Sequence, residues 1–338
     1  MGVNNNFFRI EKKSRIDTKN FRIKDYCIFY VFGKRISIKI FNLMRLFENK
    51  KIASTSKIIR NKKEIDDFIY ENMVSFQKAF QYNAVFDTRP DEITFQGICS
   101  YCGKEVVFLC EKFPQYSPDI MFSETLKCPQ CLLGNRLRAI ISVFQKFEKT
   151  PQNLKIYLQE YTTNFFKKFE EMLTSNGTNT IIGSEFLGYD KKAGEIIDGI
   201  RHENALNLSF HDNELEYIIS NDVLEHVPDI DKALSEIVRC LKPGGKLICH
   251  IPFSPHLDKT RVRAEIKEGT IIYHEEKEYH GGFSCDDPHG CLAFYNFGID
   301  FFDTLKEAGF KDSYCLGIVD EKYMNIGYEP VFIWIGEK

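Results

Sequence analysis

Two pairs of cysteines, each spaced Cys-x-x-Cys, are the residues whose chemistry is easiest to predict. Cys99 and Cys102 form the first pair, and Cys128 and Cys131 form the second. Two thiolates three residues apart on a tight turn can reach one metal ion, and two such turns supply the four ligands of a tetrahedral zinc site. Gly103, directly after the first pair, permits such a turn. Because four sulfur ligands leave no open position, we expect a structural zinc.

The other cysteines and the N-terminus bear on the cellular compartment. The chain has 11 cysteines, an odd number, and its first residues show no apolar signal-peptide core, which does not fit a secreted disulfide framework. We therefore expect a cytoplasmic protein with metal ligands and free thiols. A redox role for the pairs is the alternative, but the strand–motif–helix context is missing and the motif is duplicated. A second metal site is conceivable from His280, Cys285, His289 and Cys291, although this spacing suits no standard zinc pattern.

An apolar strand that ends in polar residues is followed by a helix and a glycine turn in the second half of the chain. The strand, at residues 217–220, continues as Asn-Asp-Val-Leu-Glu-His-Val, and the helix at 231–241 runs into Lys-Pro-Gly-Gly. This pattern resembles the class I S-adenosylmethionine-dependent methyltransferases, in particular the type 11 group, over about residues 153–336. The resemblance implies an α/β fold with a doubly wound, mostly parallel, seven-stranded Rossmann-like sheet, and S-adenosylmethionine as cofactor.

A subgroup of these enzymes carries a four-cysteine module before the fold, and the sequence resembles it in further passages. Asn-Arg-Leu-Arg-Ala at 135–139 follows the second cysteine pair, and Gly-Ser-Glu-Phe-Leu at 183–187 and Tyr-His-Gly at 279–281 also fit. The resemblance implies that Glu185 accepts hydrogen bonds from the ribose diol and that Asn204 and Ala205 meet the adenine edge. The cofactor-binding residues that we expect are Glu160, Ser184, Glu185, Asn204, Ala205 and Asn221.

The first motif departs from the family pattern. The strand expected at 155–158 runs into Gln-Glu-Tyr-Thr-Thr at 159–163, where the family usually has glycines. Close approach of the backbone to a ligand is harder without glycine. The subgroup commonly ends this strand in a segment closed by Glu, so Glu160 could face the cofactor's ammonium group. A modified site that binds cofactor and a degenerate site that does not both stay open.

Three residues are candidates for the chemistry itself. Methyl transfer is an in-line displacement in which the enzyme mainly aligns donor and acceptor, but a hydroxyl or amine acceptor must also lose a proton. His226 follows the fourth strand, and His280 lies on a long insertion at 254–296; each is a candidate proton-transfer or substrate residue. Asp222 is a candidate partner of cofactor or acceptor. The alternatives are a loop-packing role for His226, a surface position for His280 and helix capping by Asp222.

The elements that position these residues fall into three predicted segments. Residues 1–92 are an extension with a hairpin at 25–40 and a helix at 63–82, residues 93–150 hold the zinc ribbon and its exit helix, and residues 151–338 form the methyltransferase-like domain. The chain has 338 residues, is 43% hydrophobic and has a mean hydropathy of -0.30, so disordered and collagen-like classes are excluded. The longest apolar run is too short to span a bilayer.

Charge suggests alternatives for the function. The net charge is -3, yet residues 1–70 hold 17 basic and 7 acidic residues, a net of +10. Our main prediction is methyl transfer to a small-molecule or glycan-precursor acceptor. Methylation of an RNA base is the second, because a basic segment could follow phosphates. A non-catalytic binding module on a degenerate fold is the third.

Overall fold

The computed structural model describes residues 55–86, 92–111, 120–174, 177–281 and 290–338, together with three strands nearer the N-terminus. The chain divides into two compact units, Met1–Ala53 and Ser54–Lys338. The boundaries expected at residues 92 and 150 lie inside the second unit and stay a prediction. In the first unit, β1 (Phe8–Asp17), β2 (Arg22–Val31) and β3 (Lys34–Lys39) form an antiparallel sheet in that order, and β2–β3 is the predicted hairpin.

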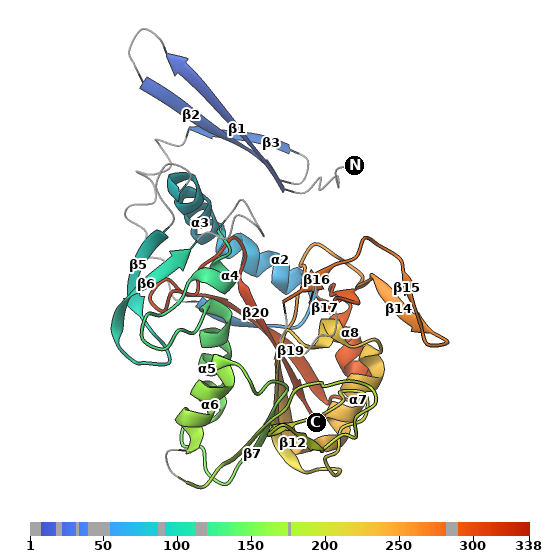
Figure 1. The fold of residues 1–338 in the computed structure, drawn as a ribbon. Coiled ribbons are helices and arrows are strands. Elements are labelled where there is room, and N and C mark those ends of the chain that lie inside the picture. The colour runs from blue at the N-terminus through green and yellow to red at the C-terminus, as the bar shows by residue number, and fades with distance from the viewer. Residues whose placement is uncertain are drawn as a thin grey trace. The chain divides into compact units, whose positions relative to one another are not determined.

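A seven-stranded sheet is the centre of the second unit, with the order β4-β19-β20-β12-β11-β7-β8 (Figure 1). The strands β8, β7, β11 and β12 are parallel neighbours, whereas β20 is antiparallel to both β12 and β19, and β19 is antiparallel to β4. Five of the seven strands therefore run in one direction, which confirms the predicted mostly parallel Rossmann-like sheet. Their bounds are β4 Thr55–Ile59, β7 Lys155–Leu158, β8 Thr180–Gly183, β11 Leu215–Asn221, β12 Leu241–His250, β19 Asp312–Val319 and β20 Val331–Glu337.

Helices cover both faces of this sheet. Successive side chains of a strand point to opposite faces, and apolar side chains on both faces pack against helices. Ile156 and Leu158 of β7 pack in one core with α5 (Asn135–Phe147) and α6 (Asn164–Thr174). Tyr157, between them, packs in a second core with α2 (Lys62–Glu71), α7 (Ile230–Cys240) and α8 (Phe301–Glu307). Figure 1 shows α5 and α6 on one side of the strands and α7 and α8 on the other. The fold is doubly wound, as predicted.

Residues 55–86 supply an edge strand and two helices to the second unit. The helix predicted at 63–82 is divided at Asn72 into α2 and α3 (Met73–Phe86). The Asn72 amide donates to the Phe68 carbonyl at 2.8 Å and accepts from the Thr55 hydroxyl at 2.8 Å. This buried side chain thus ends one helix and ties it to the first residue of β4.

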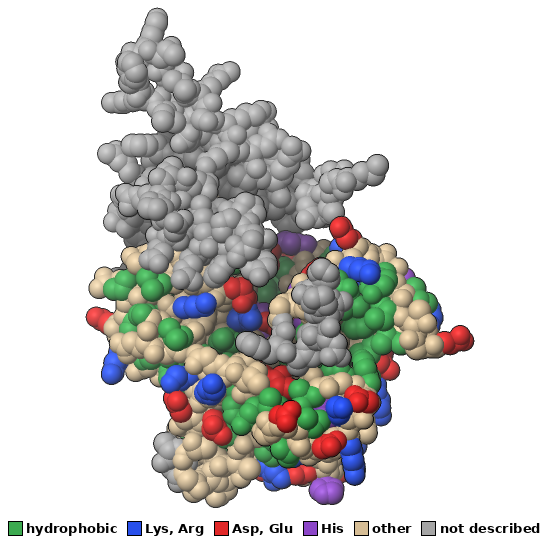
Figure 2. Space-filling model, in the orientation of Figure 1, with side chains coloured by type: hydrophobic (Ala, Val, Ile, Leu, Met, Phe, Trp, Pro, Cys, Tyr) green, Lys and Arg blue, Asp and Glu red, His purple; other side chains and the backbone are tan. Residues whose placement is uncertain are grey.

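The segment that carries the cysteines is short and lies against the same core. It consists of β5 (Glu92–Ile98), β6 (Glu105–Glu111) and α4 (Phe122–Thr125), and α5 leads out of it. The insertion between β12 and α8 contains β13 (Arg261–Val262), β14 (Ala264–Lys267), β15 (Thr270–Tyr273), β16 (Tyr279–His280), β17 (Cys291–Leu292) and β18 (Tyr295–Asn296). Figure 2 shows apolar side chains over the part of the surface where Figure 1 places β14 and β15.

Among the described residues, the sheet continues beyond β8 as a single bridge. The hairpin β9–β10 (Ile196–Ile197 and Ile200–Arg201) leads to a parallel bridge between Glu185 and His202. Glu185 donates its N–H to the Arg201 carbonyl at 3.0 Å. The segment that holds Asn204 and Ala205 is thereby brought to the carboxyl end of β8.

Candidate active site and four-cysteine centre

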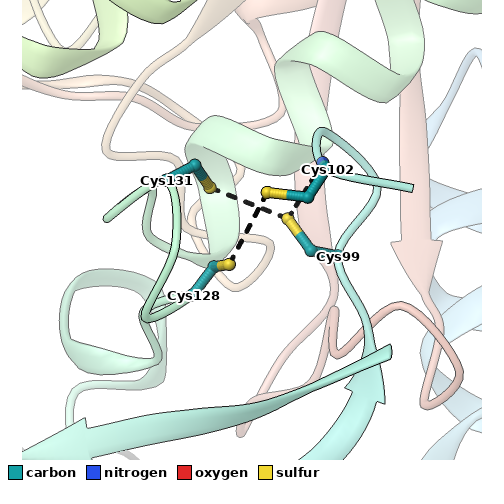
Figure 3. A group of neighbouring side chains, drawn as sticks. All are labelled: Cys99, Cys102, Cys128 and Cys131. Carbon is teal, nitrogen blue, oxygen red and sulfur yellow. Dashed lines mark hydrogen bonds between the residues drawn. The ribbon is translucent and has the colours of Figure 1, made fainter. Parts of the chain in front are cut away.

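The four cysteines of the two Cys-x-x-Cys pairs converge on one point (Figure 3). The sulfurs of Cys99 and Cys131 are 3.7 Å apart, those of Cys102 and Cys128 are 3.9 Å apart, and all four lie within 4.8 Å of one another. Zinc–sulfur bonds of about 2.3 Å in a tetrahedron would separate the sulfurs by about 3.8 Å. The spacing of the four sulfurs therefore fits a zinc ion.

Both turns that carry these cysteines have the same backbone form. The N–H of Gly103 donates to the Cys99 carbonyl, and the N–H of Leu132 donates to the Cys128 carbonyl, each at 2.8 Å. Both donors have a left-handed backbone, with φ of 67° and 61°. The first turn has the glycine that this conformation favours, whereas the second accepts leucine there.

The candidate active site lies where four parallel strands end. The carboxyl ends of parallel strands meet at one edge of a sheet, where α/β proteins bind their ligands. Glu160 follows β7, Glu185 follows β8, Asp222 follows β11, and His250 ends β12. Three carboxylates and an imidazole thus share this edge.

Glu185 shapes the glycine-free loop after β7. Its Oε1 accepts from the backbone N–H groups of Tyr161 at 3.0 Å and Thr162 at 2.9 Å, and from the Thr162 hydroxyl at 2.8 Å. Within the described residues Oε2 has no such partner. The residue expected to meet the ribose therefore holds the loop with one oxygen and keeps the other for a further donor.

Glu160 is a buried carboxyl group whose pKa is raised by its surroundings. Its side chain is 8% exposed, and the Thr163 hydroxyl donates to Oε2 at 2.5 Å. Burial raises the pKa of Glu160 to about 7, although Thr163 and Arg136 act to lower it, while Glu185 and Asp222 act with burial. A bound cation beside this carboxyl would favour the ionised form.

Asp222 is held by a charged or polar partner at each of its two carboxylate oxygens. Its Oδ1 lies 2.6 Å from His250 Nδ1, and its Oδ2 lies 2.8 Å from Arg136 Nε. Burial acts to raise the pKa of Asp222, but the Arg136 and His250 charges hold it well below its ordinary value. The backbone at Asp222 is left-handed, with φ of 50°, so this residue sits in a turn and does not cap a helix.

Arg136 is a site residue that the sequence analysis did not select. It lies in the first turn of α5, directly after the cysteine segment, and also pairs with Glu124. Its Nε is 3.3 Å from Asn221 Oδ1, which places that predicted cofactor residue beside it. The only signal in the sequence was the Asn-Arg-Leu-Arg-Ala passage, which does not say which arginine turns toward the sheet.

Other predicted cofactor residues make contacts within the protein. The Ser184 hydroxyl pairs with the hydroxyl of buried Tyr157 at 2.8 Å. Asn204 Oδ1 accepts from the Leu206 N–H at 2.9 Å, and Ala205 lies within that turn. Their roles toward a cofactor stay predictions.

The two candidate histidines lie together, 5.1 Å apart between ring centroids. His226 comes from η1 (Leu224–His226) after β11, and His280 comes from β16 of the insertion. Glu225, which the sequence analysis missed, stands between them at 3.7 Å and 3.6 Å from their nearest nitrogens. Glu225 and Glu278 raise the pKa of His280 to about 9 against the effect of burial. This neighbourhood therefore favours positive charge.

The conceivable metal site from His280, Cys285, His289 and Cys291 is not supported. Cys291 is disulfide-bonded, so its sulfur is not available as a thiolate ligand. Cys285 and His289 lie outside the described residues.

Within the part of the chain described here, no helix has the length and apolar character needed to cross a membrane.

Comparison with protein families finds one matching domain. Residues 163–249 match the family model described as "Methyltransferase domain". The match begins at the last residue of the glycine-free loop and includes β8, β11, α7 and most of β12.

Known proteins resemble the chain over short stretches. Phosphoethanolamine N-methyltransferase 2 of Caenorhabditis elegans is 44% identical over 45 residues, which cover 13% of this chain and 10% of that protein. Demethylmenaquinone methyltransferase of Staphylococcus saprophyticus is 37% identical over 78 residues, 21% of this chain and 34% of that protein. The chain therefore spans about a third or less of the length of these relatives.

Among solved structures, an S-adenosylmethionine-dependent methyltransferase from Mesorhizobium loti is 15% identical to this chain, with a TM-score of 0.37, over 61% of this chain and 98% of that one. The order and direction of the strands define the fold.

Proposed function

We propose that this protein is an S-adenosylmethionine-dependent methyltransferase whose acceptor is a small molecule or a glycan precursor. The observation that carries the proposal is that the segment matching the methyltransferase-domain family contains the strands whose carboxyl ends hold Glu185 and Asp222. The two curated relatives are named as enzymes that methylate phosphoethanolamine and demethylmenaquinone, which supports a small acceptor. Location in the cytoplasm stays a prediction from cysteine usage.

The ribose diol, the ammonium group and the adenine edge of the cofactor would each have a partner of suitable chemistry at this edge. The free Oε2 of Glu185 would accept from the ribose diol, and the Glu160 carboxylate would pair with the ammonium group. Asn204 and Ala205 would meet the adenine edge. Ser184, which pairs with Tyr157, and Asn221, which pairs with Arg136, would lie beside the cofactor. Asp222, fixed by Arg136 and His250, would orient the donor or acceptor, and His226 and His280 would face the acceptor.

Calorimetric titration of the full chain with S-adenosylhomocysteine tests the cofactor site. We expect the wild type to bind, Glu185→Ala to bind at least about tenfold more weakly because the loop and the ribose both lose an acceptor, and Asp190→Asn to bind as the wild type does. Asp190 is exposed and lies near Glu185 in sequence, so it is a matched control. No heat and no thermal shift with the wild type would favour the non-catalytic module. Equal affinity of Glu185→Ala would refute its assignment to the ribose.

We also propose that the four cysteines hold a structural zinc ion. Besides the sulfur spacing, the buried Arg138 supports an anionic centre. Its guanidinium is 0% exposed and donates to the carbonyls of Leu126, Leu133 and Met324, and it has no carboxylate partner within the described residues. A buried cation needs a compensating charge, and four thiolates around Zn²⁺ would carry a net charge of −2. Elemental analysis should find this zinc in the wild type and in Cys240→Ser, but not in Cys128→Ser; equal zinc in all three would refute the site.

A further inference from the structure

Glu225, His226 and His280 form a cluster that the cofactor assignment does not use. Their ligand atoms all lie within 4.8 Å of one another. Glu225 and His226 are neighbours in η1, whereas His280 arrives from the insertion, 54 residues further along the chain. Two imidazoles and one carboxylate are a donor set that binds divalent transition metals.

The carboxylate of Glu225 is buried, and no described side chain lies within good hydrogen-bond distance of it. Glu225 is 1% exposed, and its Oε2 has no hydrogen-bond partner within the described residues. Its Oε1 lies 3.7 Å from His226 Nε2 and 3.6 Å from His280 Nδ1, beyond good hydrogen-bond distance. A buried, unsatisfied acceptor costs free energy, and a cation between these three groups would remove that cost.

The remaining nitrogen of each histidine ring is held by the protein. His226 Nδ1 is 2.9 Å from the Leu292 carbonyl, and His280 Nε2 is 3.0 Å from Glu278 Oε1. Metal-binding histidines usually donate their other N–H to a carbonyl or a carboxylate in this way, which turns the unprotonated nitrogen toward the metal. Here the two nitrogens not so held, His226 Nε2 and His280 Nδ1, are the ones nearest to Glu225.

We propose that Glu225, His226 and His280 bind a divalent transition-metal ion, and that this ion binds the hydroxyl oxygen of the methyl acceptor. The acceptor role rests on the proposed methyltransferase function, since the cluster begins three residues after Asp222 at the cofactor edge. A metal-bound hydroxyl releases its proton to solvent more readily. The resulting oxygen forms a bond to the methyl carbon while the carbon–sulfur bond breaks and the sulfur keeps the electron pair. The products are the methyl ether and S-adenosylhomocysteine.

Titration of the zinc-loaded full chain with Mn²⁺ alone, and with Co²⁺ alone, tests the site without relying on activity. Free Mn²⁺ is measured by electron paramagnetic resonance, and bound Co²⁺ by its visible absorption. We expect one additional ion per chain in the wild type and in His274→Ala, and at least about tenfold weaker binding in Glu225→Gln and His280→Ala. His274 lies on the same insertion, exposed, and pairs with Glu265 instead.

S-adenosylhomocysteine affinity, measured on the same samples, separates the two proposals. Variants that keep this affinity but lose the additional ion are folded and support the metal site. A wild type that binds S-adenosylhomocysteine but neither Mn²⁺ nor Co²⁺ beyond the four-cysteine centre would overturn the metal site alone, as would variants that bind the ion as tightly as the wild type. A wild type that binds the ion but no S-adenosylhomocysteine would leave the metal site standing and overturn the proposed function.

Discussion

Arg136 Nε lies 2.8 Å from Asp222 Oδ2, and this ion pair joins the helix that leaves the cysteine segment to the carboxyl end of β11. Side-chain exposure is 15% for Arg136 and 24% for Asp222, so solvent only partly screens the pair. A second link is the hydrogen bond from Asn164 Nδ2, at the start of α6, to the Cys131 carbonyl at 2.8 Å. The cysteine segment and the helix that follows it are thus tied to two elements that border the candidate cofactor site, the carboxyl end of β11 and the start of α6.

Replacing Arg136 by Ala should destabilise the protein by about 1–3 kcal/mol, because Asp222 keeps only His250 as a strong partner. The loss should become smaller as the pH falls below about 4, because the lowered pKa of Asp222 contributes its full stability above the carboxyl's ordinary pKa, and this contribution is lost gradually as the pH falls toward the lowered value. Urea denaturation at pH 7 and pH 3 measures both effects. As control, Lys62→Ala breaks an exposed pair with Asp66 and should cost below about 0.5 kcal/mol. Equal losses in the two variants would contradict the prediction.

Affinity for S-adenosylhomocysteine should rise by about tenfold between pH 6 and pH 8. The pKa of Glu160 is about 7 in the ligand-free protein, and only its ionised form attracts an ammonium group. Glu160→Gln should bind weakly at both values, and its affinity should not rise with pH. A wild-type affinity that is constant over this range would show that Glu160 does not meet the ammonium group.

In the cofactor-free protein, Glu160 should make the free energy of unfolding fall as the pH rises, whereas the affinity for S-adenosylhomocysteine rises. A carboxyl whose pKa is raised on folding favours the folded state while it is protonated, and this contribution is lost as the pH rises from about 4.5 through about 7. Glu160→Gln should therefore be more stable than the wild type at pH 8, by up to about 3 kcal/mol, and not at pH 4. Thermal denaturation at the two values checks the sign; a less stable variant at pH 8 would reverse the argument.

Removal of the zinc proposed for the four cysteines should weaken binding of S-adenosylhomocysteine. The positions of Arg136 and Asn164 both depend on the cysteine segment, so we expect Cys128→Ser to bind at least about tenfold more weakly than Cys240→Ser, whose sulfur lies in α7. Calorimetry on both variants measures the difference. Undiminished affinity in Cys128→Ser would show that the two parts are independent.

Filter binding of RNA over a range of salt concentrations tests the RNA alternative. The net charge of +10 over residues 1–70 predicts some affinity at low salt. For a small-molecule enzyme, we expect this affinity to disappear by physiological salt and not to change when S-adenosylhomocysteine is added. Retention of RNA at physiological salt would instead favour the RNA methyltransferase.

The strands and helices that carry the carboxyl-end residues could be predicted, because β11, α7 and β12 have long apolar patterns that end in turn residues. The strand β8 ends at Gly183, and the hydroxyl of Ser184, the next residue, pairs with Tyr157, a contact that the sequence does not indicate. Arg136 and Glu225 could not be selected, because their partners are set by tertiary contacts and not by spacing in the sequence. The strand β4 was missed for a related reason: with only five residues, it has too little alternation to stand out.

The place of β4 at the edge of the sheet has a practical consequence. It pairs with β19 from Cys315 to Val319. A shortened protein that begins at residue 151 would leave unpaired those N–H and C=O groups of β19 that face β4, although β20 still pairs with the other edge. Exposed strand edges of this kind recruit other chains, so such a fragment should aggregate, and a useful one must begin upstream of Thr55.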